Sequence, residues 1–597
     1  MLVGTLMGGA GVALLSRLTY LQFIKGDEYS TLSEGNRIKL QLIAPPRGLI
    51  TDKFGVAMAS NEVNYRLFLD RENPKQARTA LGLLSKLLDW SEGYTKQMLA
   101  QISNRPKGPL LVADHVGWEQ LARIEYYLTE LPNILLEEGQ VRSYPFSDHS
   151  AHLIGYVGRV AQGEASVSDP LSRLPEYKVG KNGIEFLFEE TLRGTAGTKH
   201  IEVNVSGLPV RELSKQAPKS GDTLKLTIDS RLQEFIVERL QDQSGAVVVM
   251  DVHSGEILAL VSVPGFDPNV FSKGIPETYW KQLNANEKNP LLNKAISGQY
   301  PPGSTFKMVT ALAALKEGKI TDKTHVFCPG HFYLGNHRFN CWKPEGHGLM
   351  DLTHALAESC DTFFYTVGRA AGIEAMAEAG HKLGLGEVTG SLLRGEKSGI
   401  MPSPEWKKKV RGQIWNPGET INTAIGQGDV LMTPLQMAVM TARLVNGGKQ
   451  VVPRFEHVQV DENKQEKFAT LGFDPEHLLQ VKEGMDWVIN NPRGTAYGAR
   501  IIDPALGSFA GKTGTAQVRR ITVRGQNQNL IAWRFRHHAW FCGYGPVENP
   551  QYAVAVLIEH GGGGASAAAP VARDVMMKIE ELRQALPPGV NHEEKSS

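Results

Sequence analysis

The chain has 597 residues, of which 41% are hydrophobic and 21% are charged, and its formal net charge is +1. This composition is ordinary for a globular protein, and the length predicts about two to four domains. A nearly neutral chain has no overall field that would attract nucleic acid, so no nucleic-acid partner is expected. Four cysteines are too few for a disulfide framework.

Residues 1–24 predict a membrane anchor. The only charged residue among them is Arg17, and as a helix they would extend roughly 36 Å, enough to cross a bilayer. A cleaved signal peptide is one alternative, but the basic start and the cleavage site between small residues that it should show are not evident. A buried helix of a soluble protein is a further alternative. Tyr20 and Phe23 suit a membrane interface. We therefore expect an uncleaved anchor, with everything after it on one side of the membrane.

Strand and turn signals dominate between residues 25 and 220. The stretch 42–61 alternates as strands do around a Pro-Pro-Arg-Gly turn, and 75–102 carries leucines at helical spacing. The stretch 180–207 has a short amphipathic helix between glycine-rich turns. These signals predict a β-rich domain.

A second domain is expected over 221–586, followed by a loose polar tail at 587–597. Residues 220–240 predict a strand that continues into a helix. The stretch 245–264 is the clearest hairpin, because two apolar runs are joined by His-Ser-Gly-Glu.

Residues 298–319 combine a Gly-Ser turn with a run of helical apolar spacing. Ser304 and Lys307 are three residues apart, so they share one face of the predicted helix. A serine is a poor nucleophile until a base takes its proton, and a lysine can be that base when burial or nearby cations favour its neutral form. The helix start also suits an oxyanion, because its N–H groups carry positive charge. An N-cap serine with a surface lysine is the simpler alternative.

Two further polar segments have the chemistry to complete a site. The β-rich stretch 510–518 holds a lysine and two hydroxyls that suit a carboxylate, and a glycine that lets a ligand approach the backbone: Lys512, Thr513, Gly514 and Thr515. The stretch 358–365 places polar side chains on both sides of a cysteine: Ser359, Cys360 and Asp361. Each stretch also has a simpler explanation when taken singly: 510–518 could be a glycine-containing strand edge, and 358–365 could hold a helix N-cap.

Ser-x-x-Lys, a Ser-x-Asp variant and Lys-Thr-Gly, in this order, are similar to the signature of penicillin-binding proteins and class A β-lactamases. The chain resembles class B penicillin-binding proteins over nearly its whole length, for example in APPRGLITDKFGVAMA, RSYPFSDHSAHLIGYVG, GIEFLFEETLRGTAG and TAIGQGDVLMTPLQMA. Gln-Tyr-Pro-Pro-Gly before Ser304, together with Asp361, is most similar to the elongation branch, the penicillin-binding protein 2 type.

The resemblance implies an α/β (α+β) transpeptidase domain of the β-lactamase-like kind, with an antiparallel sheet between helices. An elongated β-rich pedestal and a single N-terminal transmembrane helix would precede it. We therefore expect a transmembrane anchor at 1–24, a pedestal of the dimerisation type at 25–220, the transpeptidase domain at 221–586 and a flexible tail at 587–597. The protein would be single-pass in the bacterial inner membrane, with its catalytic domain in the periplasm.

The resemblance also implies a serine-type D,D-transpeptidase that cross-links peptidoglycan stem peptides during cell elongation, releases D-Ala and is a target of β-lactams. Ser304 would attack the penultimate D-Ala carbonyl, Lys307 would be the general base and Ser359 would relay a proton. Asp361 would position the donor peptide or orient Lys307 by its charge, since a carboxylate cannot donate a hydrogen bond unless it is protonated.

The remaining site residues would hold the donor peptide. Its terminal carboxylate would bind to the lysine and hydroxyls of one strand: Lys512, Thr513, Gly514 and Thr515. The backbone N–H groups of Ser304 and Thr515 would form the oxyanion hole. A SEDS-type glycan polymerase and membrane proteins of the elongation complex are the implied partners. A septal class B transpeptidase, a silent scaffold and a serine β-lactamase are the alternatives, although no glutamate is placed to serve a lactamase as its deacylation base.

Three of the four cysteines gather with a histidine in one stretch: Cys328, Cys341, His347 and Cys360. Three thiolates and one imidazole are typical of a closed structural zinc site. A Cys328–Cys341 disulfide is the alternative outside the cytoplasm, and His331 and His337 are the alternative imidazoles. The resemblance favours one structural zinc ion, since elongation-type members can carry a metal in this segment. Because Cys360 stands between Ser359 and Asp361, a metal would brace both neighbours.

The fourth cysteine, Cys542, lies in the apolar stretch AWFCGY. An isolated cysteine in such a setting behaves as a small hydrophobic residue. We therefore expect Cys542 to be buried in a strand.

Overall fold

The computed structural model describes residues 11, 14–20, 38–71, 73–104, 110–131, 133–160, 171, 177–203, 209–457, 468–518 and 530–585. The predicted tail at 587–597 and most of the predicted anchor at 1–24 lie outside these residues. Within the described part of the chain, no helix is both long and apolar enough to cross a membrane.

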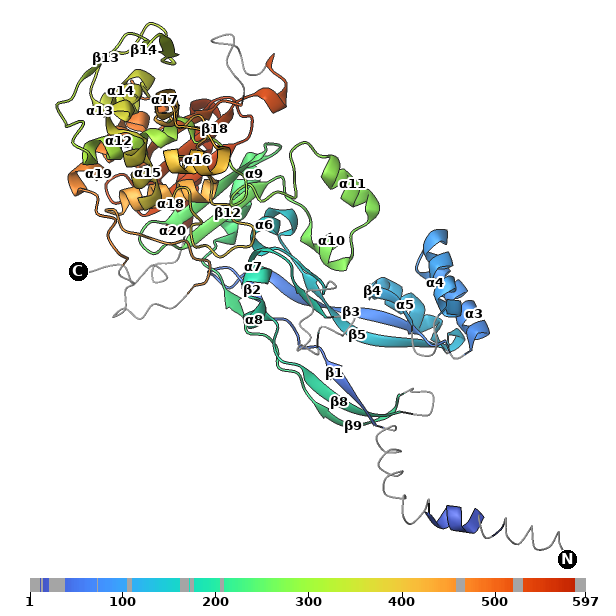
Figure 1. The fold of residues 1–597 in the computed structure, drawn as a ribbon. Helices are drawn as coiled ribbons and strands as arrows, with labels where there is room; N and C mark the ends of the chain where they lie inside the picture. The colour runs from blue at the N-terminus through green and yellow to red at the C-terminus, as the bar shows by residue number, and fades with distance from the viewer. Residues whose placement is uncertain are drawn as a thin grey trace, which may run out of the picture.

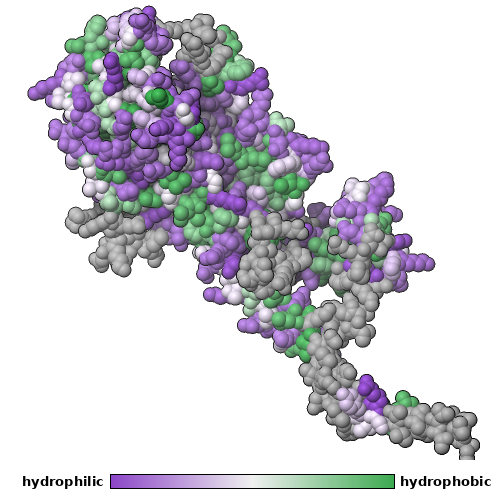
Figure 2. Space-filling view, in the orientation of Figure 1, coloured by the Kyte–Doolittle hydropathy of each residue, from purple (hydrophilic) through white to green (hydrophobic). Residues whose placement is uncertain are grey.

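The molecule is elongated, with a large mixed domain at one end of a narrow β-rich pedestal (Figure 1). Hydrophilic side chains dominate the visible face of the large domain, while apolar patches lie nearer the pedestal (Figure 2). The part of the pedestal farthest from the large domain in Figure 1 is a three-stranded sheet in the order β1-β8-β9, formed by Ile38–Ile43, Gly197–Val203 and Pro209–Gln216.

A second pedestal sheet is built around one long strand, β3 (Ala57–Leu69). This strand pairs with β5 (Ile134–Ser143) in an antiparallel register from Ser60 opposite Ser143 to Leu69 opposite Ile134. The other strands of the sheet are β2 (Ile50–Thr51), β4 (Leu110–Val116) and β10 (Leu224–Lys225). Because β10 pairs with β2, the chain joins the pedestal sheet once more immediately after the predicted domain boundary at residue 220.

The predicted helical stretch 75–102 forms two helices, α3 (Pro74–Leu87) and α4 (Glu92–Asn104). The break has a local cause, because Asp89 has a left-handed φ of 51° that a helix cannot accommodate. Ser91 then accepts a hydrogen bond from the Tyr94 N–H and caps the start of α4. With α5 (Trp118–Tyr126), these helices cover one face of β3 and form a separate apolar core.

A buried group of charges, which we call the pedestal ion cluster, lies where strand β5 meets α7 (Gly183–Leu187) and α8 (Glu189–Leu192). The guanidinium groups of Arg47 and Arg142 each donate to the Glu185 carboxylate, over 2.6 and 2.7 Å, and Arg47 also donates to Glu189 over 2.7 Å. Burial would raise the pKa of Glu185, but Arg142 and Arg47 outweigh it and hold the pKa below its usual value. Two positive charges thus face two negative ones.

The large domain is organised on a five-stranded antiparallel sheet in the order β12-β11-β19-β18-β17. Its strands are β11 (Gly245–Asp251), β12 (Ile257–Val263), β17 (Ala510–Ala516), β18 (His538–Gly545) and β19 (Tyr552–Ile558). The predicted hairpin at 245–264 is confirmed as β11 and β12. Strand β17, which carries the predicted carboxylate-binding residues, is an edge strand.

Helices cover both faces of this sheet, as expected. Along β11, Ala246, Val248 and Met250 join the core that contains α12 (Lys307–Lys316), α14 (Asp361–Ala371) and α18 (Pro434–Val445). The alternate residues Val247 and Val249 pack in the core of α9 (Ser230–Leu240) and α20 (Ala569–Gln584). Burial on both faces explains why the strand is apolar throughout. The predicted antiparallel sheet between helices is confirmed.

Candidate active site

Ser304 lies in a short 3-10 turn, η5 (Gly303–Phe306), that leads directly into α12. The preceding Gly303 has a φ of +58° and donates its N–H to the Gly426 carbonyl over 2.9 Å. A Cβ at this position would lie 2.7 Å from the Thr515 carbonyl oxygen. Only glycine therefore lets the serine turn approach the edge strand β17 so closely.

Lys307 is fully buried, so the alternative of a surface lysine beside an N-cap serine is wrong. Its Nζ donates to Asp361 Oδ1 over 2.6 Å, to the Ser359 carbonyl over 2.9 Å and to Ser359 Oγ over 3.2 Å. Ser359 stands in the turn between α13 (Leu352–Ala357) and α14, with a left-handed φ of 55°. A non-glycine residue held in this conformation is strained, which is frequent at functional sites.

Lys512 reaches the same hydroxyl from strand β17, since its Nζ lies 3.0 Å from Ser359 Oγ. Burial, and then the charge of Lys307, lower the pKa of Lys512 well below the usual lysine value. The Ser359 hydroxyl is thus held between two lysine amines. We call Lys307, Ser359, Asp361 and Lys512 the lysine cluster.

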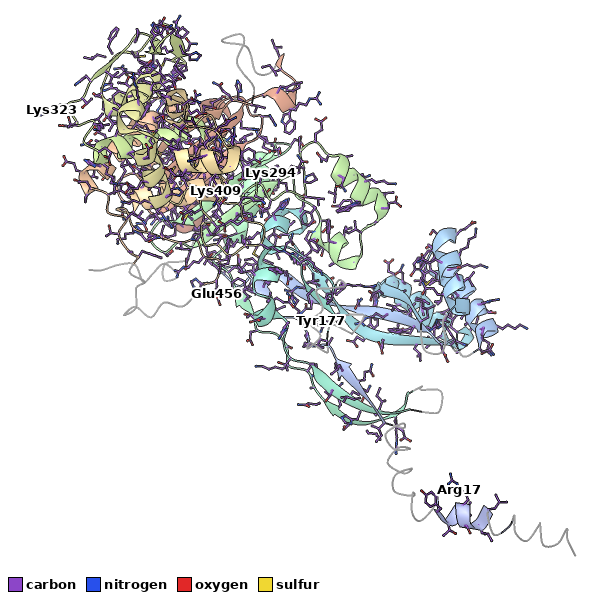
Figure 3. The ribbon with its side chains drawn as sticks, in the orientation of Figure 1. Arg17, Tyr177, Lys294, Lys323, Lys409 and Glu456 are labelled. Atoms are coloured by element: carbon purple, nitrogen blue, oxygen red, sulfur yellow. The ribbon has the colours of Figure 1, made fainter. Side chains whose placement is uncertain are left out.

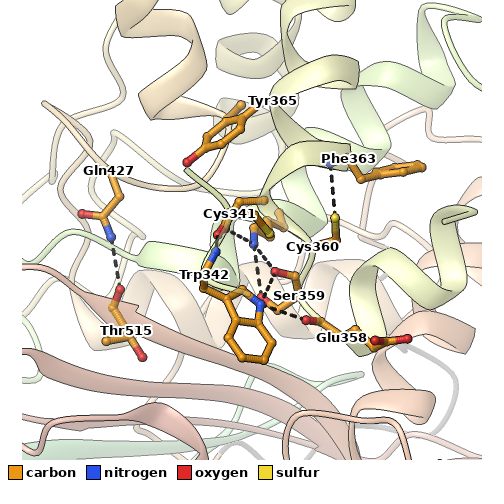
Figure 4. Close-up of polar contacts among 12 residues, drawn as sticks. Cys341, Trp342, Glu358, Ser359, Cys360, Phe363, Tyr365, Gln427 and Thr515 are labelled. Atoms are coloured by element: carbon orange, nitrogen blue, oxygen red, sulfur yellow. Dashed lines mark hydrogen bonds and ion pairs between the residues drawn. The ribbon is translucent and has the colours of Figure 1, made fainter. Parts of the chain in front are cut away.

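The open edge of β17 is directed toward the active site. Gln427 donates its side-chain N–H to the Thr515 carbonyl over 3.1 Å (Figure 4). The N–H and C=O of one strand residue face the same side, so the Thr515 N–H also faces this edge. The Thr513 hydroxyl bonds the Thr495 hydroxyl over 2.9 Å. Sequence patterns did not identify Gln427 and Thr495, although Gln427 stands between two glycines in the quoted TAIGQGD stretch.

A cleft of about 1000 Å³ brings the predicted residues together. One wall carries the serine, the hydroxyls and the strand edge: Ser304, Ser359, Asp361, Thr513, Gly514 and Thr515. Lys307 and Lys512 lie beneath this wall and are fully buried. Another part of the lining comes from a hairpin, β14 (His331–Leu334) paired with β15 (His337–Asn340).

The hairpin starts and ends at a group of sulfur and nitrogen atoms, which we call the Cys3His cluster. It comprises Cys328, Cys341, His347 and Cys360, whose ligand atoms all lie within 4.8 Å of one another. All four cysteines of the chain are free thiols. His331 instead contacts Arg338 and His337 lines the cleft, so His347 is the imidazole in the cluster. Cys542 is buried in β18, as predicted.

The spacing of the cluster fits a tetrahedral metal ion. The His347 Nδ1 atom lies 3.6 Å from Cys328 Sγ and 3.5 Å from Cys341 Sγ. A tetrahedral zinc ion, with bonds of about 2.3 Å to sulfur and about 2.0 Å to nitrogen, separates its ligands by about 3.5–3.8 Å. A Cβ on Gly346 would lie 2.2 Å from the Cys328 carbonyl oxygen, so a glycine is needed to bring the two ends of the loop together.

The cluster also has the charge of a cation site. A hydrogen bond with the Cys360 thiol lowers the pKa of Cys341 to about 2, while the same contact raises the pKa of Cys360. Burial would lower the pKa of His347, but the neighbouring thiols at 341 and 328 outweigh it and raise the pKa. The lowered pKa values of Cys328 and Cys341 favour their thiolates, and closely packed thiolates are suited to a soft divalent cation.

Trp342 connects the Cys3His cluster to the lysine cluster (Figure 4). Its backbone N–H donates to Asp361 Oδ2 over 2.8 Å. Its indole Nε1 donates to the carbonyls of Glu358 and Ser359, each over 3.1 Å. The residue next to Cys341 therefore holds both residues that flank Cys360.

A half-buried Ser304 shares a cleft with Ser359, whose hydroxyl two buried lysines contact, at the edge of an antiparallel sheet between helices. This arrangement is that of a serine acyltransferase of the penicillin-binding type. The family model of the penicillin-binding protein transpeptidase domain matches residues 245–577, and that of the penicillin-binding protein dimerisation domain matches residues 42–226. The chain belongs to the class B penicillin-binding proteins, as the sequence predicted.

Individual relatives are similar over nearly the whole chain. Peptidoglycan D,D-transpeptidase MrdA of Acinetobacter baumannii is 36% identical, over 93% of this chain and 84% of its own length. The solved complex between penicillin-binding protein 2 and MreC from Helicobacter pylori has a chain with a TM-score of 0.81 and 31% identity, over 91% of this chain and 99% of that one. A solved peptidoglycan synthase complex has a chain with a TM-score of 0.69 and 29% identity, over 98% of this chain and 99% of that one.

These relatives confirm the predicted branch and activity. The chain is a serine-type D,D-transpeptidase of the elongation type, with a transpeptidase domain and a dimerisation domain.

Proposed function

We propose that Ser304 forms an acyl-enzyme with the penultimate D-Ala of a peptidoglycan stem peptide, releases the terminal D-Ala, and passes the acyl group to an amine of a second stem peptide. The observation that carries this proposal is the Ser359 hydroxyl, held 3.2 Å from Lys307 and 3.0 Å from Lys512 beside Ser304 in one cleft. Such an arrangement can move a proton between two amines.

The charge balance of the lysine cluster assigns the resting protonation states. Two lysines share a single carboxylate, Asp361, which pairs with Lys307 at 2.6 Å. The pKa of Lys512 is lowered, chiefly by burial, so Lys512 is the neutral amine at rest. In this state Lys307 would donate to Ser359 Oγ, and the Ser359 hydroxyl would turn its own proton toward the neutral Lys512 amine 3.0 Å away.

Substrate binding would then activate the nucleophile. A terminal carboxylate near β17 stabilises the ammonium form of Lys512. A proton can then pass from Lys307 to Ser359 and from Ser359 to Lys512, which leaves Lys307 neutral. Neutral Lys307 takes the Ser304 hydroxyl proton as the oxygen attacks the carbonyl. Asp361 keeps Lys307 in place throughout.

The donor peptide would add to the edge of β17 as an extra strand. The hydroxyls of Thr513 and Thr515, with Gly514 between them, would hold its terminal carboxylate. The N–H groups of Ser304 and Thr515 would stabilise the oxyanion, a role supported by the outward direction of the Thr515 backbone. Gln427 occupies the Thr515 carbonyl until the peptide arrives.

Labelling with a fluorescent penicillin tests this assignment. Stable labelling that is lost in Ser304→Ala, together with release of D-Ala from a pentapeptide by the native protein only, is the expected result. Ser297→Ala is the matched control, because the Ser297 hydroxyl is exposed and bonds the Gly395 carbonyl. Rapid turnover of the label would indicate a lactamase, and a protein that never labels would indicate a scaffold.

We also propose that the Cys3His cluster binds one structural zinc ion. Cys328, Cys341, His347 and Cys360 would hold it, and with all four ligands from the protein no position is left for a reacting water. The ion would supply a cross-link and neutralise the thiolates. The sulfur–nitrogen distances support this proposal. Mass spectrometry of the purified protein should find about one zinc per chain, lost in Cys341→Ala. A metal-free protein with a stoichiometric disulfide would contradict the proposal.

We further propose that residues 1–24 are a single transmembrane anchor in the bacterial inner membrane, and that residues 25–220, 221–586 and 587–597 are the pedestal, the periplasmic catalytic domain and the tail. The similarity to elongation transpeptidases supports this arrangement. Resistance of the full chain to extraction from membranes by alkaline carbonate is expected. Release by carbonate would contradict the anchor.

The partners would be a SEDS-type glycan polymerase and other membrane proteins of the elongation complex. The Helicobacter pylori protein is in complex with MreC, and another similar chain is part of a peptidoglycan synthase complex. Depletion of the protein from its cells should give round cells, because elongation stops while division continues. Filaments would indicate a septal role instead.

A further inference from the structure

The cleft is larger than the donor end requires. Its volume of about 1000 Å³ is at the upper end of the range of about 300–1,000 Å³ that encloses drug-sized ligands. In the proposed function, the wall that carries Ser304 and the edge of β17 binds the terminal D-Ala residues of the donor. The β14–β15 hairpin lines the same cleft and is therefore available to another part of the peptide substrates.

The hairpin is fixed in position, although it is a two-stranded ribbon. At its base, the Cys341 N–H donates to the Gly330 carbonyl over 2.9 Å, next to the Cys3His cluster. Along its length, Tyr365 of α14 donates its hydroxyl to the Asn340 carbonyl over 3.2 Å. The Phe339 ring packs 5.7 Å from the Tyr365 ring. Side chains on this hairpin can therefore make specific contacts with a ligand.

Arg338 carries an uncompensated charge on this hairpin. The other formally charged residue that lines the cleft, Asp361, is paired with Lys307. The exposed Arg338 donates Nη2 to His331 Nδ1 over 3.3 Å. In the described part of the chain it forms no ion pair with a carboxylate. The hairpin thus presents a guanidinium to the cleft beside the aromatic ring of Phe339.

We propose that Arg338 forms a second carboxylate subsite, which binds a carboxylate of a stem peptide other than the terminal one held by β17. This inference rests on the proposed function, since it assigns a substrate group to the same cleft. A guanidinium pairs with a carboxylate through two parallel hydrogen bonds, which a carboxamide cannot reproduce. The enzyme should therefore distinguish peptides that carry free carboxylates from peptides with amides at the same positions.

The experiment compares two sets of synthetic stem peptides, identical except that their internal carboxylates are free or amidated. With the native full-length protein, amidation should raise KM by about tenfold or more and leave kcat unchanged, because a charged hydrogen bond is lost. In Arg338→Gln the two sets should have equal KM. Arg338→Lys should keep part of the difference. Lys323→Gln, an exposed lysine of the same domain that does not line the cleft (Figure 3), should behave as the native protein.

Two kinetic measurements, single-turnover acylation and transfer from a preformed acyl-enzyme, identify which peptide carries the carboxylate. If it belongs to the donor, amidation of the donor slows single-turnover acylation of Ser304. If it belongs to the acceptor, amidation of the acceptor slows only the transfer from a preformed acyl-enzyme. A native protein that does not distinguish the two sets in either measurement overturns the proposal, as does an Arg338→Gln variant that keeps the preference.

Penicillin labelling separates this proposal from the proposed function. Arg338→Gln should label at the native rate and keep its metal content, because the β-lactam carries no group for this subsite and the Cys3His ligands are untouched. Slower labelling in both Arg338→Gln and Arg338→Lys would mean that Arg338 only supports the hairpin, and would overturn the subsite. Failure of the proposed function would appear as labelling that persists in Ser304→Ala.

Discussion

The lysine cluster and the pedestal ion cluster are both buried networks of charged side chains, but they differ in charge balance. In the pedestal ion cluster, two guanidinium groups face the two carboxylates of Glu185 and Glu189. In the lysine cluster, two amines share the single carboxylate of Asp361, and Lys512 has a strongly lowered pKa.

This difference separates a structural network from a reactive one. In a balanced buried network every charge faces an opposite one, so no group is driven to change its protonation, and the network holds its parts in one geometry. A network with one amine too many must leave that amine neutral, and a neutral buried amine can take up a proton during a reaction. The comparison predicts that the two clusters respond differently to the loss of one charge and to pH.

The largest effect is expected from Lys307→Met. Removal of the general base should slow acylation of Ser304 by labelled penicillin by about 1000-fold or more, while the protein stays folded, because the remaining Lys512 and Asp361 can still contact Ser359 and Trp342. Stopped-flow labelling measures the rate, and circular dichroism checks the fold. Lys294→Met is the matched control, since Lys294 is equally buried in the same domain (Figure 3) and its side-chain amine donates to the Asn289 carbonyl, away from the lysine cluster. Comparable slowing in the control would show that any buried lysine has this effect.

The opposite outcome is expected from Arg142→Gln in the pedestal ion cluster. Glu185 would remain buried with one guanidinium fewer, which should lower the free energy of unfolding by about 3–5 kcal/mol. The acylation rate per folded molecule should not change. Urea unfolding and penicillin labelling measure the two quantities separately. Arg239→Gln, which breaks a more exposed pair with Asp574, should cost less than about 1 kcal/mol. A large loss of acylation in folded Arg142→Gln would remove the distinction between the clusters.

Lowering the pH should affect the lysine cluster before the pedestal ion cluster. When Lys512 is protonated in the free enzyme it can no longer accept the proton of Lys307, so acylation should fall by about tenfold per pH unit below the folded pKa of Lys512. Because the folded pKa of Lys512 is lowered, the unfolded chain binds more protons than the folded chain at pH values above that pKa. The free energy of unfolding therefore also decreases as the pH falls toward the folded pKa of Lys512. Glu185 has a pKa below its usual 4.5, so its contribution is present above that value and is lost only as the pH falls through the folded pKa. Labelling rates and unfolding midpoints across a pH series test this order, and a rate that does not change with pH would contradict a neutral Lys512.

Much of the site was predictable because its residues are marked by local patterns. Ser304 and Lys307 share a helical face, and the hairpin of β11 and β12 follows from two apolar runs around a turn. The Cys3His set was also recognisable by composition. The local pattern could not decide which histidine belongs to the Cys3His cluster, because the choice depends on the direction in which the β14–β15 hairpin projects. The hairpin carries His337 into the cleft and leaves His347 beside the sulfurs.

The contacts between distant segments were not predictable. Gln427 reaches Thr515 and Thr495 reaches Thr513 only because the loops before α18 and after α19 (Pro475–Asn490) meet at the edge of β17. A glutamine or threonine in a loop carries no periodic signal. The break between α3 and α4 was missed for a similar reason, since the leucine spacing continues through the left-handed Asp89. Tertiary contacts and single backbone conformations decide such positions.

The smallest effect, and the finest test of the comparison, is expected from Trp342→Phe. The substitution removes the indole N–H that donates to the Glu358 and Ser359 carbonyls, but it keeps the backbone N–H that bonds Asp361. One lost hydrogen bond of this kind corresponds to about 0.5–1.5 kcal/mol, so acylation should slow by about threefold to tenfold. Because Trp342 is 57% exposed, little apolar burial is lost with it.

The metal content decides what such a decrease means. In Trp342→Phe all four Cys3His ligands remain, so zinc should stay bound while acylation slows. In Cys341→Ala both should be lost together, because the tryptophan loses its anchor as well. If Trp342→Phe is as active as the native protein while Cys341→Ala is slow, the Cys3His cluster acts on the lysine cluster through Cys360 at the start of α14 rather than through the indole. Either result identifies the contact through which the Cys3His cluster holds the lysine cluster in its reactive geometry.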